Sequence, residues 1–79
     1  MAEDLIGSIT LMAYTFDVQD YFLCDGRQLP ISQYQALYSL IGNKWGGDGR
    51  NYFNLPKMEP ADKNMRYYIC HNGYYPNRV

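Results

Sequence analysis

The stretch that most constrains the fold is residues 33–41, where apolar side chains recur at helical spacing. Tyr34, Leu37, Tyr38 and Ile41 recur at positions i, i+3, i+4 and i+7 and form one apolar stripe, which Leu40 widens. Ser32 and Gln35 have the spacing of a capping box, and Gly42 is a natural residue to end a helix. The sequence therefore predicts one helix over residues 33–41.

The remaining apolar segments are short and are bounded by Gly, Pro or Asp, as is typical of strands: 6–16, 21–24, 27–30, 51–56 and 65–71. Asp25-Gly26 is a hairpin signal, because type I′ turns need positive φ at both central positions. It predicts that 21–24 and 27–30 pair with each other. The polar segment 57–64, which contains Pro60, predicts an exposed linker. The expected fold class is α+β: a small β-rich domain, residues 1–79, with the helix packed on short antiparallel strands and hairpins.

The length of the chain leaves its stability marginal. A domain of 79 residues buries roughly 60% of the surface that its unfolded chain exposes. Nine tyrosines, three phenylalanines and one tryptophan add apolar area, but nine tyrosines are more than so small an interior can hide. We therefore expect a homo-oligomer. The alternative is that the tyrosines are half-exposed, with their hydroxyls in water.

The distribution of charged and apolar residues argues against two classes of partner, duplex nucleic acid and the membrane. The net charge is −1 and the seven basic residues are scattered, so we expect no duplex nucleic acid partner. No apolar run approaches the ~20 residues that span a bilayer, so we expect no membrane insertion. The acidic start Met1-Ala2-Glu3-Asp4 is unlike a secretory signal, which predicts a protein kept in the host cytoplasm or assembled there into something larger.

The residues that could perform chemistry are few. Cys24 and Cys70 lack CxxC spacing, so they are either two buried thiols or a mutual disulfide. His71 follows Cys70 directly, and neighbours in a strand point to opposite faces. No catalytic motif or metal-ligand spacing is present. We expect no catalytic residue, no metal and no cofactor, and hence no enzyme.

The glycine-rich stretch NKWGGDGRNYFNL, residues 43–55, is the remaining candidate site. It follows a helix and lacks the Lys-[Ser/Thr] ending of a P-loop. One interpretation is a tight corner in which Trp45 plugs the core and Asp48 is a turn residue. The other is a nest of backbone N–H groups that binds a small anion. The candidate ligand-binding residues are Trp45, Asp48, Arg50, Tyr52 and Arg66.

Four ordered motifs resemble the phage tail collar domain, which occurs in tail-fibre proteins and in bacterial microcystin-dependent proteins. They are Cys24-Asp25-Gly26-Arg27-Gln28-Leu29, Ile31-Ser32 through Ala36-Leu37, Gly46-Gly47-Asp48-Gly49, and Phe53-Asn54-Leu55-Pro56. Together with the ending at residues 65–79, the resemblance covers nearly the whole chain.

This resemblance implies a small oligomeric collar or tail-fibre component of the virion, with a trimer as the form that the family's fibres suggest. Other tail proteins would then be its partners. A second hypothesis is a phage-encoded sequestering protein, which captures a nucleotide-like immune signal or a sugar in pockets between subunits. In such pockets the aromatic residues would stack on the ligand and the arginines would bind its anionic group.

Overall fold

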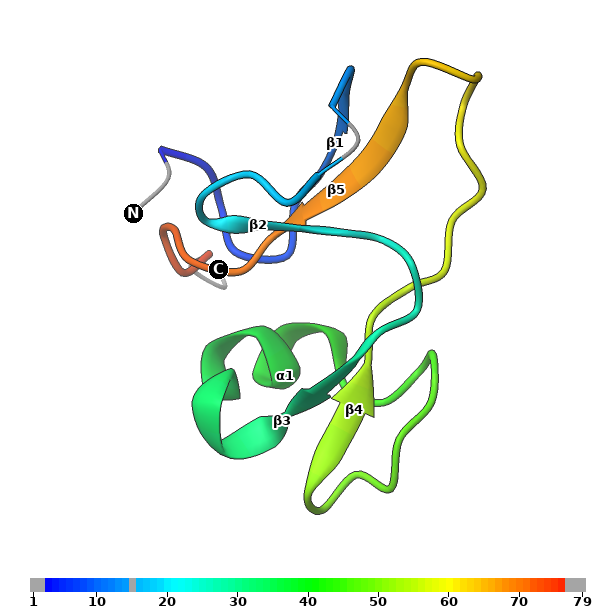
Figure 1. The fold of residues 1–79 in the computed structure, drawn as a ribbon. Coiled ribbons are helices and arrows are strands. Elements are labelled where there is room, and N and C mark those ends of the chain that lie inside the picture. Colours follow the sequence, from blue (N-terminus) through cyan, green and yellow to red (C-terminus); the bar gives the residue numbers. More distant parts are fainter. Residues whose placement is uncertain (1–2, 15, 77–79) are drawn as a thin grey trace.

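The computed structural model describes residues 3–14 and 16–76 and has two small sheets and a helix (Figure 1). The strands are β1 (Ile9–Met12), β2 (Tyr21–Leu23), β3 (Gln28–Pro30), β4 (Tyr52–Asn54) and β5 (Arg66–Cys70). A 3₁₀ turn, η1 (Ile31–Gln33), precedes the helix α1 (Gln35–Ile41). This arrangement confirms the predicted α+β, β-rich fold class.

The chain forms two lobes (Figure 1). In the upper lobe β5 lies between β1 and β2, and it is antiparallel to both. In the lower lobe β3 pairs antiparallel with β4, beside α1. Two segments, 24–27 and 55–65, connect the lobes. The pairing partners are far apart in sequence, so the fold depends on non-local contacts.

The hairpin predicted at Asp25-Gly26 is wrong, because β2 pairs with β5 while β3 pairs with β4. Gly26 has a φ of 81°, but Asp25 does not share the positive φ that a type I′ turn needs at both positions. The Asp25 carboxylate instead accepts a hydrogen bond from the backbone N–H of Arg27 at 3.1 Å. The turn therefore carries the chain from one lobe to the other.

The predicted helix is present but begins later than expected. Residues 31–33 form the 3₁₀ turn, and the first residue of α1 is Gln35. Tyr34 occupies the N-cap position and no side chain caps the helix, so the capping box predicted for Ser32 and Gln35 is wrong. At the other end Gly42 has a φ of 63° and donates to the Tyr38 carbonyl at 2.8 Å, which confirms its role as the helix terminator.

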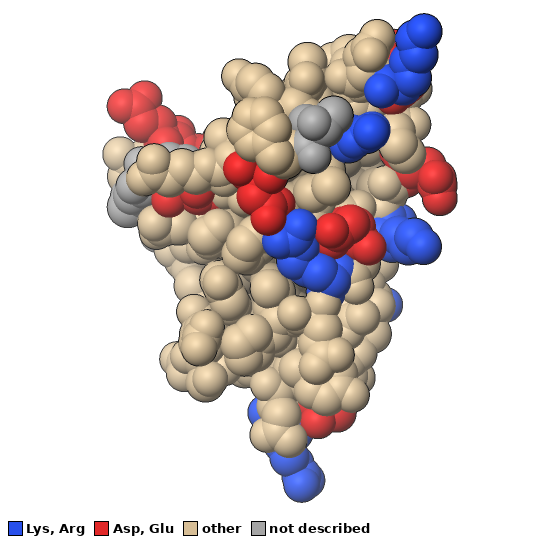
Figure 2. All heavy atoms as spheres, viewed as in Figure 1, with Lys and Arg blue, Asp and Glu red and all other residues tan. Residues whose placement is uncertain are grey.

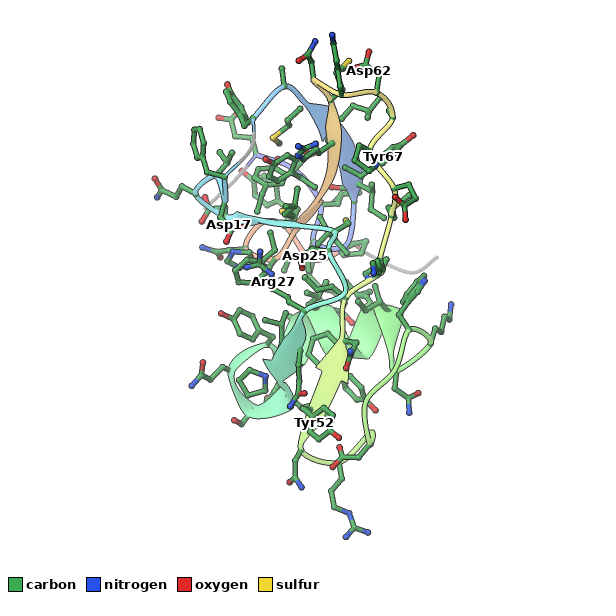
Figure 3. The ribbon with its side chains drawn as sticks, turned by 45° about the vertical axis from the view of Figure 1, so that its right-hand side comes forward. Asp17, Asp25, Arg27, Tyr52, Asp62 and Tyr67 are labelled. Carbon is green, nitrogen blue, oxygen red and sulfur yellow. The ribbon has the colours of Figure 1, made fainter. Side chains whose placement is uncertain are left out.

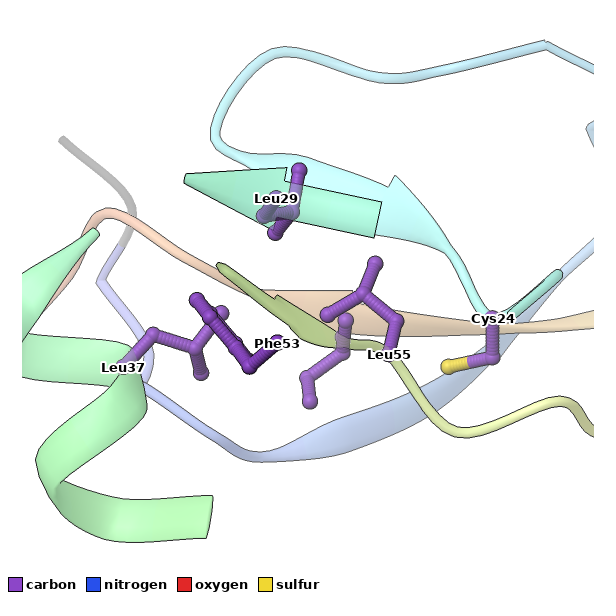
Figure 4. Close-up of a cluster of buried hydrophobic side chains, with 6 residues drawn as sticks. Cys24, Leu29, Leu37, Phe53 and Leu55 are labelled. Atoms are coloured by element: carbon purple, nitrogen blue, oxygen red, sulfur yellow. The ribbon is translucent and has the colours of Figure 1, made fainter. Parts of the chain in front are cut away.

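The core lies where the two lobes meet (Figure 4). It draws one side chain each from β3, α1, β4 and β5 and two from the segments that connect the lobes: Leu29, Leu37, Phe53, Ile69, Cys24 and Leu55. Phe53, Leu55 and Ile69 are fully buried. Because both sheets and the helix contribute to this cluster, it couples the stability of the two lobes.

Both cysteines are buried and free, as the first of the two interpretations expected. Burial raises the pKa of the Cys24 thiol to about 11, so the thiolate is scarce at neutral pH. His71 stacks on Phe22, with 4.0 Å between ring centroids, and burial lowers the pKa of His71. In the described structure Cys24 and Cys70 are thus buried core residues, and His71 packs against an aromatic ring.

Charged side chains are unevenly distributed over the surface. In the view of Figure 2 they gather over the upper lobe and at the lower tip, and the surface over α1 and β3 carries none. None of the helices in residues 3–14 and 16–76 is long and apolar enough to cross a membrane.

Candidate functional site

The glycine-rich loop folds back on β4 and forms a corner. The Gly46 carbonyl accepts a hydrogen bond from the Asn54 N–H at 3.1 Å, and the Gly49 N–H donates to the Tyr52 carbonyl at 3.4 Å. Between these two bonds Gly47 forms an isolated antiparallel bridge with Phe53. The loop thus extends the lower sheet by one short, irregular segment.

The carboxylate of Asp48, an exposed residue, holds this corner together through hydrogen bonds to the loop backbone. Its Oδ1 accepts hydrogen bonds from the N–H groups of Arg50, Asn51 and Tyr52, at 2.9, 2.8 and 3.1 Å. These donors hold the pKa of the Asp48 carboxyl below its ordinary value. Three successive N–H groups at the end of the glycine loop thus already bind a carboxylate of the protein itself.

We expect Asp48→Ala to lower the melting temperature and to increase amide hydrogen exchange at residues 50–52, because three backbone donors lose their acceptor. Asp48→Asn is the matched control, since its side-chain oxygen can still accept from the same donors. Thermal melts and hydrogen exchange by NMR would check this. Equal melting temperatures for the Ala and Asn variants would contradict the role given to the carboxylate.

Trp45 does not plug the core, and that prediction is wrong. The indole is 46% exposed, and the position next to α1 is occupied by Phe53, whose ring lies 5.3 Å from that of Tyr38. Trp45 and Arg50 are instead both exposed side chains of the loop. The Tyr52 side chain is half-buried at the start of β4.

The structure brings four of the five candidate residues to one region and separates the fifth. Arg66 is the first residue of β5 and pairs in register with Met12. It therefore belongs to the upper sheet, whereas Tyr52 lies near the lower tip of the molecule (Figure 3). The five candidate residues therefore do not form one site within a single chain; the prediction placed them in pockets between subunits.

Sequence reasoning missed an ion-pair network around Arg27, which Figure 3 labels with its two partners. The guanidinium lies 2.8 Å from Asp17 and 3.0 Å from Asp25. It also lies over the Phe22 ring, 5.0 Å from the centroid. Hydrogen bonds from Arg27 hold the pKa of Asp25 below its ordinary value. Because Asp17 is ten residues from Arg27, no short sequence motif predicts this ion-pair network.

Sequence reasoning also missed a cavity of about 200 Å³ between β5 and the segment that follows Pro56. Its walls are formed by three segments of the chain: Leu23, Cys24 and Asp25; Lys57, Met58, Glu59 and Pro60; and Arg66 and Tyr67. Arg66, one of the five candidate residues, thus lines a hollow in the described structure. No sequence signal could reveal the cavity, because its walls come from segments that are far apart in the sequence and meet only in the folded chain.

Comparison with known proteins identifies the family. No curated protein and no solved structure matches the chain. The family model described as Phage Tail Collar Domain matches residues 7–61, which include the helix, the glycine corner and β4. The collar domain is a structural domain of phage tails and is not known as a catalytic domain. Because the match covers more than half of the 79 residues, the chain belongs to the phage tail collar domain family.

Proposed function

We propose that this protein is a non-catalytic component of the phage tail collar or fibre that assembles with copies of itself. The observation that carries the proposal is a surface without charge. Between Arg27 and Lys44 the chain has sixteen consecutive residues, 28–43, and none of them is charged. This segment contains β3, η1 and α1, and most of its side chains are exposed or half-buried. Depletion of charge is the compositional mark of the centre of a protein interface.

Exposed apolar side chains adjoin this surface. Leu5, Tyr74 and Tyr75 are 49%, 53% and 48% exposed. Leu5 and Tyr74 form a parallel bridge, and the Tyr75 hydroxyl lies 2.7 Å from the Ser39 Oγ on α1. The apolar patch is therefore continuous with the uncharged helix, as expected of a surface that is covered in an assembly.

A second copy of the chain is the partner that this surface suits best. In a symmetric assembly, residues near the axis meet the same residues of a neighbour, so a charge there would face its own sign. An uncharged surface avoids this repulsion. A trimer is the form we propose, with other tail proteins as further partners and the virion as the location.

The test is a pair of substitutions at two exposed alanines. Ala36→Lys places a charge on α1, and Ala61→Lys places the same charge in the segment between β4 and β5. Native mass spectrometry of the unmodified protein should show an oligomer, which Ala36→Lys should dissociate and Ala61→Lys should leave intact. A monomeric unmodified protein, or an Ala36→Lys variant that assembles normally, would contradict the proposal.

A second candidate function is the capture of a small ligand, a nucleotide-like immune signal or a sugar, and the exposure of Trp45 favours it. An exposed indole on the same loop as an exposed arginine can stack on a base or a sugar ring while the guanidinium binds an anionic group. In this function the pocket would form between subunits, and Arg66 of a neighbour could complete it. Detection of the protein in purified virions, without a co-purified small molecule, would favour the collar role. A bound nucleotide or sugar in protein from infected cells would favour capture.

A further inference from the structure

We propose that the cavity beside Arg66 binds a small molecule that has an apolar body and one anionic group, a carboxylate or a phosphate. This inference goes beyond the collar role, which needs no ligand. It also concerns a different place from the glycine corner, because the walls of the cavity come from residues 23–25, residues 57–60 and the start of β5.

Backbone hydrogen bonds fix the walls of the cavity in place. The Cys24 N–H donates to the Tyr67 carbonyl at 3.0 Å, and the Met58 N–H donates to the Cys24 carbonyl at 3.0 Å. Asp25 and Lys57 form an isolated antiparallel bridge next to these bonds. The segment 57–60 is therefore tied to the strand end that it faces. A pre-formed cavity binds a ligand without the cost of ordering its own walls.

The interior suits an apolar body of modest size. A volume of about 200 Å³ corresponds to roughly seven water molecules in the liquid. The lining includes the apolar side chains of Leu23, Met58 and Pro60 and the ring of Tyr67. Tyr67 is half-buried, and its hydroxyl has no hydrogen-bond partner among the residues that the structure describes. One benzene ring is a reasonable match to this space.

The charges on the lining favour an anion. In the described part of the chain neither Lys57 nor Arg66 has an ion-pair partner. Asp25 does not compensate for them, because both of its carboxylate oxygens accept hydrogen bonds from Arg27. Of the lining carboxylates, only that of the exposed Glu59 is then left without a partner in the described structure. The cavity thus offers two available cations against one solvated acid.

Arg66 is the residue that we expect to contribute most to binding. Its side chain is half-buried at the first position of β5, so it is held more firmly than the exposed Lys57. A guanidinium presents paired donors that match the two oxygens of a carboxylate or a phosphate. A bound anion would thus receive bidentate hydrogen bonds from Arg66 while its apolar body contacts Met58 and Tyr67.

The test is an NMR titration of the whole isotope-labelled chain with two probes, phenyl phosphate and phenylacetate. Both should shift the amide signals of Met58, Arg66 and Tyr67, and the tighter probe tells which anionic group the cavity prefers. Benzylamine, which carries the opposite charge on the same ring, should not bind there. Arg66→Gln should weaken the tighter probe at least tenfold. Lys63→Gln removes a positive charge from the segment just before β5, outside the cavity, and should change the affinity for the same probe less than twofold.

Three results would overturn the proposal. They are the absence of shifts at the cavity with either anion, equal binding of benzylamine, and binding that Arg66→Gln leaves intact in a folded variant. Shifts confined to Trp45 and Arg50 would place the anion at the glycine corner instead. The proposal can fail independently of the collar role, because the oligomeric state is measured without a ligand and the Ala36→Lys substitution does not touch the cavity.

Discussion

Replacing Gly47 with alanine is expected to abolish the cooperative thermal unfolding transition. A Cβ atom at this position would lie 2.5 Å from the Phe53 Cα and 2.6 Å from the Tyr52 carbonyl oxygen. Both atoms belong to the backbone of β4, so no side chain can rotate away to make room. Relief would require the loop to leave β4, which would break the bridge between Gly47 and Phe53 and expose a fully buried ring. The φ of +105° adds backbone strain for any residue with a Cβ.

Gly42→Ala is the matched control for this prediction. Gly42 also has positive φ and has a ψ of −154°, a region that is nearly specific to glycine, but nothing lies within 4 Å of its added Cβ. It therefore measures backbone strain alone, of order 1–3 kcal/mol, which lowers the melting temperature of a chain this size by roughly 4–24 °C. Circular dichroism melts would compare the two variants. A Gly47→Ala variant as stable as Gly42→Ala would show that the loop can move away from β4 at little cost, and would contradict the prediction.

This pair of variants also bears on what the glycine corner does. A ligand loop keeps glycines so that its backbone can approach a bound molecule, and an alanine there would reduce affinity more than stability. At Gly47 the close approach is to the protein's own strand. The fold thus accounts for the glycine at the corner. It does not account for the exposed side chain of Trp45.

The sequence predicted the elements better than their pairing. The apolar stripe of residues 34–41 identified α1, and the apolar runs identified the strands. The hairpin signal at Asp25-Gly26 failed because a local turn preference competes with tertiary contacts. Here Arg27 binds Asp25 and Asp17 together, and β5 offers β2 a longer, buried partner. Such pairing between distant segments cannot be predicted from a few neighbouring residues.

The candidate site was predictable only in part, for a related reason. Asp48 followed by glycine was correctly interpreted as a turn residue, because the bonds it makes are to its own neighbours. The burial of Trp45 was predicted wrongly, because residue type alone does not reveal that Phe53 already fills the space under the loop. The cavity at Arg66 depends on three segments that are far apart in the sequence, at the end of β2, after Pro56 and at the start of β5, so only the folded chain shows it.

Phe53→Ala is expected to cost about 3–5 kcal/mol of unfolding free energy, the usual range for deleting a fully buried phenyl ring. Small domains have total stabilities near the low end of about 5–15 kcal/mol, so this loss would leave little of the folded state. The ring contacts the core at the junction of the two lobes (Figure 4), so both should lose structure together.

The control makes the same substitution at Phe16, whose ring is 63% exposed. Urea titrations of both variants would separate the effect of burial from the loss of an aromatic residue, and we expect Phe16→Ala to change the midpoint little. Phe53→Leu should fall between Phe53→Ala and the unmodified protein, because a leucine refills part of the space. If Phe53→Ala unfolded only the lower lobe, with the amides of β1 and β5 still protected from exchange, the two lobes would have separate stabilities. The shared cluster would then not be what holds the chain together.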